Sequence, residues 1–99
     1  MVDHYKLNRD ISRGNDAQSL LNNETLKECF SVLERAYIDV WKGTSAKDQD
    51  GREKLFLAVN IIGKVREHLT KLASSGRLAA SDVEAIAAEE KRKKLLGII

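Results

Sequence analysis

The sequence predicts an all-α protein built around an antiparallel helical hairpin. The 99 residues include no proline and only 5% aromatic residues, which disfavours the many turns and strands of a sandwich or barrel. Apolar residues recur at spacings of three and four rather than two, which is the helical period. With 42% hydrophobic and 32% charged residues, the chain suits one small folded domain rather than a disordered segment.

The N-terminal residues 1–15 follow neither the helical nor the strand period, and we expect them to form an arm. The remaining residues, 16–99, are expected to form a single helical domain. Its first long helix is predicted over residues 23–42, ending near Gly43. The apolar positions of this helix fall within about 80° of one another on a helical wheel; they are Leu26, Phe30, Leu33, Tyr37 and Val40. Cys29 lies on this face, so we expect it to be buried as a small apolar side chain.

A turn-like stretch over residues 44–51 predicts the connection of the hairpin, because its length suits two antiparallel helices. Asp50 and Glu53 have the spacing of a capping box and indicate the start of a second helix, over about 52–75. Gly76 is expected to end this helix in the left-handed conformation. The predicted seam toward the first helix consists of Leu55, Ala58, Ile62, Val65, Leu69 and Leu72.

A third, C-terminal helix is predicted over about 82–95. Ser81 and Glu84 have the spacing of a further capping box, and the apolar residues that follow are mainly alanine. Such a helix buries little apolar area.

The start of the second predicted helix is apolar around its whole circumference, which indicates burial on every side. The first helix covers one side of it, and the alanine-rich third helix covers only part of another. We therefore expect self-association, most simply as a homodimer of two hairpins. The alternative is that the N-terminal arm covers this end with Tyr5, Leu7 and Ile11. The predicted oligomer interface consists of Leu55, Phe56, Leu57, Val59, Ile61, Ile62 and Gly63.

No arrangement of residues points to catalysis, a cofactor or a metal. Asp48, Asp50 and Gly51 have the order of a calcium loop, but Ala46 and Leu57 stand where the loop needs its strongest carboxylates. Phosphate-binding loops, dinucleotide fingerprints and nucleophile elbows are absent from the sequence. We therefore expect a protein that is not an enzyme.

Basic residues in the second half of the chain keep a nucleic-acid alternative open. The net charge of +2 is too small to indicate such binding by itself, and the basic block near the C-terminus is also what a solvated helix end favours. Contact with a phosphate backbone would be nonspecific, since no helix-turn-helix spacing is present. The candidate phosphate contacts are Lys64, Lys71, Arg77, Lys91, Arg92, Lys93 and Lys94.

No apolar run approaches the roughly 20 residues of a membrane span. The first ten residues carry charges where a signal peptide is apolar, so we expect a cytoplasmic product that does not bind membranes.

Several short stretches between residues 16 and 79 share a pattern with known proteins. They are Asn22-Asn23-Glu24, Ala36-Tyr37-Ile38, Asp48-Gln49-Asp50-Gly51-Arg52-Glu53-Lys54-Leu55 and Gly63-Lys64-Val65-Arg66-Glu67-His68-Leu69. In these stretches the chain resembles short helical accessory proteins encoded by tailed phages and prophages. The resemblance implies an accessory or assembly role and assigns no functional residue. The hairpin also resembles the oligomerising core of small terminase subunits, without their separate DNA-binding domain. Together these observations predict a non-catalytic, homo-oligomeric interaction or assembly protein with an unidentified protein partner; the alternative is a nonspecific nucleic-acid-binding accessory protein.

Overall fold

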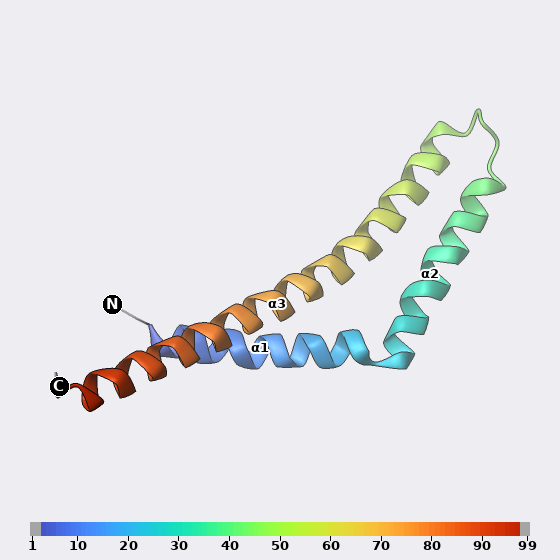
Figure 1. The fold of residues 1–99 in the computed structure, drawn as a ribbon. Coiled ribbons are helices and arrows are strands. Elements are labelled where there is room, and N and C mark those ends of the chain that lie inside the picture. Colours follow the sequence, from blue (N-terminus) through green and yellow to red (C-terminus); the bar gives the residue numbers. More distant parts are fainter. Residues whose placement is uncertain (1–2, 98–99) are drawn as a thin grey trace.

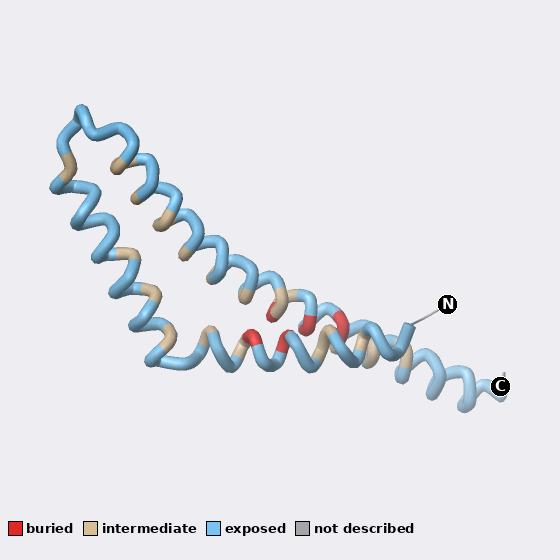
Figure 2. The backbone as a smooth tube through the Cα atoms, turned by 180° about the vertical axis from the view of Figure 1, so that it is seen from behind, coloured by how far each residue is buried: buried red, intermediate tan, exposed pale blue. Residues whose placement is uncertain are grey.

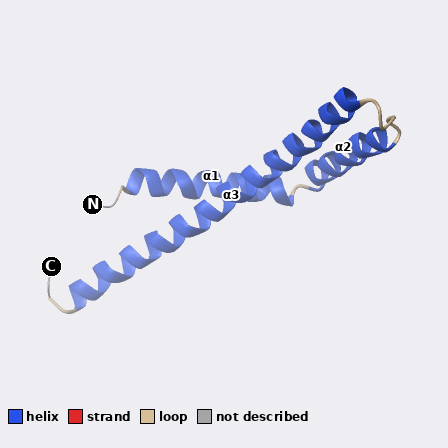
Figure 3. Cartoon of the chain, turned by 90° about the horizontal axis from the view of Figure 1, so that it is seen from above, coloured by secondary structure: helices blue, strands red, loops and turns tan. Residues whose placement is uncertain are grey.

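A computed structural model describes residues 3–97, which form three helices and no strand (Figures 1 and 3). The helices are α1 (His4–Asn22), α2 (Glu24–Lys42) and α3 (Gln49–Leu95). α2 and α3 run antiparallel and are joined by a short loop, so the all-α class and the predicted hairpin are confirmed. The molecule is long and thin, with extents of 75 × 27 × 17 Å.

Each helix begins at a side chain that accepts a hydrogen bond from the first turn. Asp3 Oδ1 accepts from the Lys6 amide at 3.0 Å, and Asn23 Oδ1 accepts from the Leu26 amide at 2.9 Å. Asp48 Oδ1 accepts from the Gly51 amide at 3.0 Å, so α3 starts slightly before the predicted position. Asn23 alone separates α1 from α2, and its extended backbone makes the elbow in Figure 1.

The predicted break at Gly76 is wrong, because α3 continues through it for 47 residues in all. The predicted helices over 52–75 and 82–95 are therefore one helix, and Ser81 lies inside it rather than at a cap. Gly76 is buried against α1, where the absence of a side chain lets the two backbones meet. Among the described residues, the left-handed conformation is found only at Gly97, with φ of 70°.

The predicted N-terminal arm is also different in the structure, since residues 4–15 belong to α1. Leu7 and Ile11 are half-buried, and Gly14 and Ala17 are buried, which gives a face with helical spacing. The pattern is visible in the sequence only when glycine and alanine are counted as packing residues, because the face is built for close approach rather than for large side chains.

α1 and α3 cross at two glycines (Figure 2). A Cβ atom built on Gly14 would lie 2.6 Å from Gly76 Cα, and one built on Gly76 would lie 2.7 Å from Gly14 Cα. The buried apolar side chains of the described chain surround this crossing and are small: Ala17, Ala73 and Ala79. The core of the single chain is therefore a contact between backbones, with little apolar volume.

Two arginines of α3 contact the side of α2 that faces it. Arg66 forms an ion pair with Glu34 at 3.0 Å and lies over the Phe30 ring, 5.0 Å from its centroid. Arg52 lies 4.2 Å above the Trp41 ring, which adds a cation–π contact near the loop. The seam residues Leu55, Ala58, Ile62, Leu69 and Leu72 are half-buried, although Leu72 lies beside Gly14 of α1. Val65 is exposed, and its neighbour Arg66 contacts α2 instead.

Candidate interaction surface

The single chain exposes far more surface than a compact domain of its size. Its accessible area is 7815 Å², whereas a folded monomer of 11.1 kDa exposes about 5,700 Å². The radius of gyration is 21.6 Å, against about 13 Å for a compact domain of this length. About 2,100 Å² of surface is therefore in excess of what a globular monomer shows.

Part of this excess is an apolar stripe along α2. Phe30, Glu34 and Trp41 contact α3, and the stripe lies about 110° further round the helix. Leu33 and Val40 are 46% and 58% exposed, and the thiol of Cys29 is exposed rather than buried as predicted. The α2 stripe consists of Cys29, Leu33, Ala36 and Val40, at spacings of four, three and four.

The sequence itself indicates the α2 stripe, because the apolar residues of α2 occupy a wide arc of the helical wheel. Eight of the ten apolar residues of α2 fall within about 140°, a wider arc than one neighbouring helix covers. The apolar spacing alone predicts that Leu33 and Val40 face the hairpin partner, but in the structure Glu34 contacts Arg66 of α3, and Leu33 and Val40 are exposed.

A second apolar stripe follows α3. Leu57, Ile61 and Val65 are about half exposed or more and fall within about 80° on the helical wheel. Of the residues of α3 that are buried against α1, Ala79 falls within this arc, whereas Gly76 and Ala73 lie about 60° and 120° from its centre, in line with the seam toward α2. α2 and α1 therefore cover successive parts of one side of α3, and the α3 stripe lies beside that side.

The two stripes lie on the same side of the hairpin. On both helices, the stripe is displaced from the α2–α3 contact in the same direction of rotation when each helix is viewed from its N-terminus. Because the two helices are antiparallel, equal directions of rotation place both stripes on the same side of the hairpin. By the same rule, residues displaced in the opposite direction lie together on the other side of the hairpin. Ile38 of α2 and Phe56 of α3 agree with this, because both line one cavity, which also includes Trp41, Leu55 and Val59. Seven residues of the two stripes thus form one surface, termed here the stripe face: Cys29, Leu33, Ala36, Val40, Leu57, Ile61 and Val65.

The residues predicted for the oligomer interface are divided by the structure. Leu55, Val59 and Ile62 are half-buried toward α2. Leu57 and Ile61 belong to the stripe face, whereas Phe56, 61% exposed, lies on the opposite side. A Cβ atom built on Gly63 has no neighbour within 4 Å, so no close contact within the single chain requires glycine at this position.

The candidate phosphate contacts are not gathered into one patch. Lys64 and Lys71 share a face of α3, but Arg77 lies about 120° round the helix from them. Lys71 pairs with Glu67 at 3.4 Å, and Arg77 donates to Gln18 Oε1 at 3.0 Å. The four remaining positions are consecutive, so they point in all directions around the end of α3; they are Lys91, Arg92, Lys93 and Lys94.

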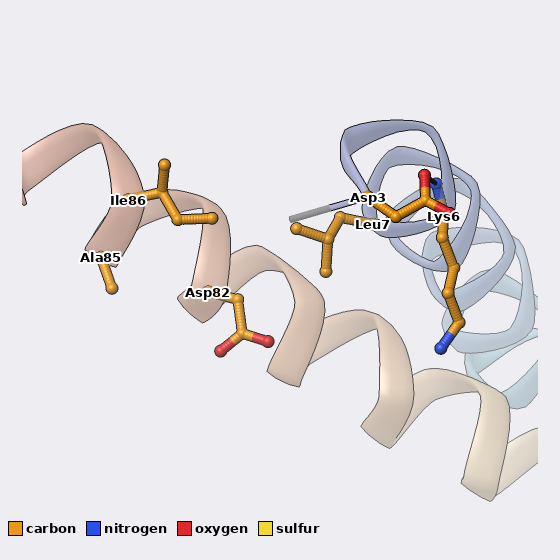
Figure 4. Close-up of a pocket in the computed structure, with 6 residues that line it drawn as sticks. All are labelled: Asp3, Lys6, Leu7, Asp82, Ala85 and Ile86. Carbon is orange, nitrogen blue, oxygen red and sulfur yellow. Dashed lines mark hydrogen bonds between the residues drawn. The ribbon is translucent and has the colours of Figure 1, made fainter. Parts of the chain in front are cut away.

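A groove of about 440 Å³ lies where the start of α1 passes α3 (Figure 4). Leu7 reaches from α1 toward α3, and Ala85 and Ile86 supply the opposite wall. Its charged groups, from Asp3, Lys6 and Asp82, stand at the rim without forming an acid–base pair among themselves. The groove resembles the edge of a helix contact rather than a reaction site.

No group of three or more potential metal ligands is found among residues 3–97. Within the same range, no helix has an apolar stretch of the length needed to cross a membrane. Comparison of the chain with protein-family models, with curated proteins and with solved structures finds no match.

Proposed function

We propose that this chain is a non-catalytic, homo-oligomeric helical protein, most simply a dimer, that acts as an interaction or assembly component. The observation that carries the proposal is the excess exposed area of about 2,100 Å² per chain. Stable homodimers bury about 2,000–5,000 Å² in total over both partners, so two chains have enough surplus surface for such an interface.

The energetic reason is that the core of the single chain contains few apolar side chains, and all of them are small. The buried apolar side chains between residues 3 and 97 are three alanines, each of which contributes little on burial. Large side chains such as Ile61 and Val40 are 61% and 58% exposed in the single chain, so covering the rest of each contributes about 1–2 kcal/mol. Association with another apolar surface supplies the missing burial.

An accessory role in phage assembly, with a further protein partner, belongs to this proposal through the resemblance of residues 16–79. The elongated shape suits it, because a chain 75 Å long presents both an association surface and free helix ends.

Sedimentation equilibrium across micromolar concentrations tests the proposal. We expect a mass of about 22 kDa or an integer multiple, against the chain mass of 11.1 kDa. Circular dichroism at the same concentrations should show helix content that falls as the oligomer is diluted, because folding and association are coupled. A helical species of 11.1 kDa at every concentration would refute the proposal.

A further inference from the structure

We infer that a cavity between α2 and α3, close to the loop that joins them, is a docking site for another protein, whose docking segment places a large apolar side chain beside a carboxylate. This cavity, termed here the loop-end cavity, is lined by Ile38, Trp41, Leu55, Phe56 and Val59. The inference rests on the proposed function only for the existence of a further protein partner. It adds the place and the chemistry of that contact.

The size and composition of the loop-end cavity suit one or two side chains that project from a partner. Its volume is about 350 Å³, and all of its lining residues are apolar. Phe56 is 61% exposed and Trp41 is 38% exposed, so the cavity is open to solvent, whereas a small-molecule site buries most of its ligand. Tryptophan, phenylalanine and arginine are also enriched in the buried centres of protein–protein interfaces.

A guanidinium group stands at the loop side of the cavity. On the helical wheel, Arg52 falls in the middle of the arc formed by the three lining residues of α3, one turn nearer the loop. Arg52 lies 4.2 Å above the Trp41 ring and donates to Thr44 Oγ1 at 2.9 Å. Among residues 3–97, no carboxylate forms an ion pair with Arg52 or with Lys42, which follows Ile38 by one turn on α2. This end of the cavity is therefore positively charged.

The second arginine–aromatic pair of the hairpin shows what the first one lacks. Arg66 lies over the Phe30 ring and also pairs with Glu34 at 3.0 Å. Glu34 follows Phe30 by four residues along α2. Four residues after Trp41 the chain has Ser45, which lies in the loop and carries no charge. One arginine is thus neutralised within the chain, and the other is left for a carboxylate from outside.

The chain's own carboxylate at this end is engaged elsewhere. Asp48, four residues before Arg52, caps α3 by accepting a hydrogen bond from the Gly51 amide at 3.0 Å. Because Arg52 is half-buried, a carboxylate from a partner can form charge-assisted hydrogen bonds with it while the neighbouring apolar side chain fills the cavity. A second copy of this chain fits less well, since a two-fold contact centred on the cavity brings arginine against arginine.

Selection of peptides from a displayed library tests this chemistry. The full chain is the target, and the library holds random peptides of about 12 residues. We expect the selected peptides to be enriched in aspartate or glutamate close to a large apolar residue, relative to the unselected library. Replacement of that acidic residue by its amide should weaken binding at least about tenfold, because the hydrogen bond to a charged group is lost. Trp41 is the only tryptophan of the chain, so its emission reports the binding of peptides without tryptophan.

Matched variants locate the binding site. Arg52→Gln removes the guanidinium at the cavity, and Arg13→Gln removes the same charge from the exposed surface of α1, which does not line the cavity. We expect the first variant to raise the dissociation constant of the selected peptides at least about tenfold, and the second to leave it within about twofold. Phe56→Ala should also weaken binding at least about tenfold while circular dichroism shows the helix content of the wild type, because this side chain is 61% exposed.

The outcomes separate this inference from the proposed self-association. Peptides without an acidic preference, peptides that bind Arg52→Gln as tightly as the wild type, an unchanged Trp41 emission, or a selection that enriches no peptide would each overturn the docking site and leave self-association standing. If Arg52→Gln loses helix content, Phe56→Ala decides. A lower oligomer mass of a folded Arg52→Gln in sedimentation would show that a second copy occupies the cavity, which also overturns the inference. A wild-type monomer that still binds the acidic peptides refutes self-association and supports the docking site.

Discussion

The two glycines of α3 that lie away from its ends should respond in opposite directions to replacement by alanine. Gly76 is buried at the crossing with α1, whereas Gly63 is exposed in the middle of the same helix. The substitutions Gly76→Ala and Gly63→Ala add the same methyl group to the same helix. Their difference therefore isolates the helix crossing.

The magnitudes depend on the surroundings of the added atom. At Gly76 a Cβ would lie 2.7 Å from Gly14 Cα and 2.9 Å from the Asp10 carbonyl oxygen, so the two backbones must separate. Overpacking of this kind costs about 1–3 kcal/mol, and the better helix propensity of alanine offsets about 1 kcal/mol of it. Movement of the helices also loosens the surrounding alanines, which adds to the cost. At Gly63 nothing lies within 4 Å of the added atom, so the propensity gain of up to about 1 kcal/mol remains.

Thermal unfolding followed by circular dichroism, with all proteins at one chain concentration, measures the difference. We expect Gly63→Ala to melt at or above the wild-type temperature and Gly76→Ala to melt below it. A difference of about 2 kcal/mol corresponds to a separation of about 8–16 °C for a domain of this size. Equal melting temperatures, or a more stable Gly76→Ala, would refute the close glycine crossing. A destabilised Gly63→Ala would show instead that Gly63 packs against something outside the single chain.

Two further perturbations test the elbow and the nucleic-acid alternative. Asn23→Ala removes the side chain that accepts a hydrogen bond from the Leu26 amide at 2.9 Å, so we expect the free energy of unfolding, measured by chemical denaturation, to fall by about 1 kcal/mol. As a control, Ser19→Ala on the exposed side of α1 should change it by less than about 0.5 kcal/mol. In titrations with duplex DNA at low and physiological salt, we expect no salt-sensitive binding, because the basic residues of α3 point in different directions. A DNA affinity that falls with salt as steeply as the release of several counterions requires would favour the nucleic-acid alternative.

Much of the fold is determined by local patterns in the sequence. The caps at Asn23 and near Asp48, together with the apolar period between them, are short-range features, and they predict α2 and the start of α3 closely. The antiparallel return of the chain is a consequence of the length of the loop between residues 43 and 48. The α1 helix is not predicted by the apolar period, because its packing face contains Gly14 and Ala17, which carry almost no hydrophobic signal.

The candidate site was predictable in part. The apolar excess near Leu57 and Ile61 is visible in the sequence and indicates an unpartnered surface. The division of that excess between two sides of the hairpin is not visible, because it depends on how α2 is rotated about its axis. In the structure Glu34 and Phe30 of α2 contact Arg66, more than thirty positions away, and no local pattern in the sequence predicts this pairing.

The sequence by itself determined the helical class, the hairpin and the presence of more apolar surface than one small chain hides, because these depend on spacing, caps and composition. Only the tertiary structure decided that α3 continues through Gly76 and that residues 4–22 lie across it. The physical reason is one of magnitude. Glycine weakens a helix by only about 1 kcal/mol, so a backbone contact that needs glycine at the crossing outweighs its tendency to end the helix.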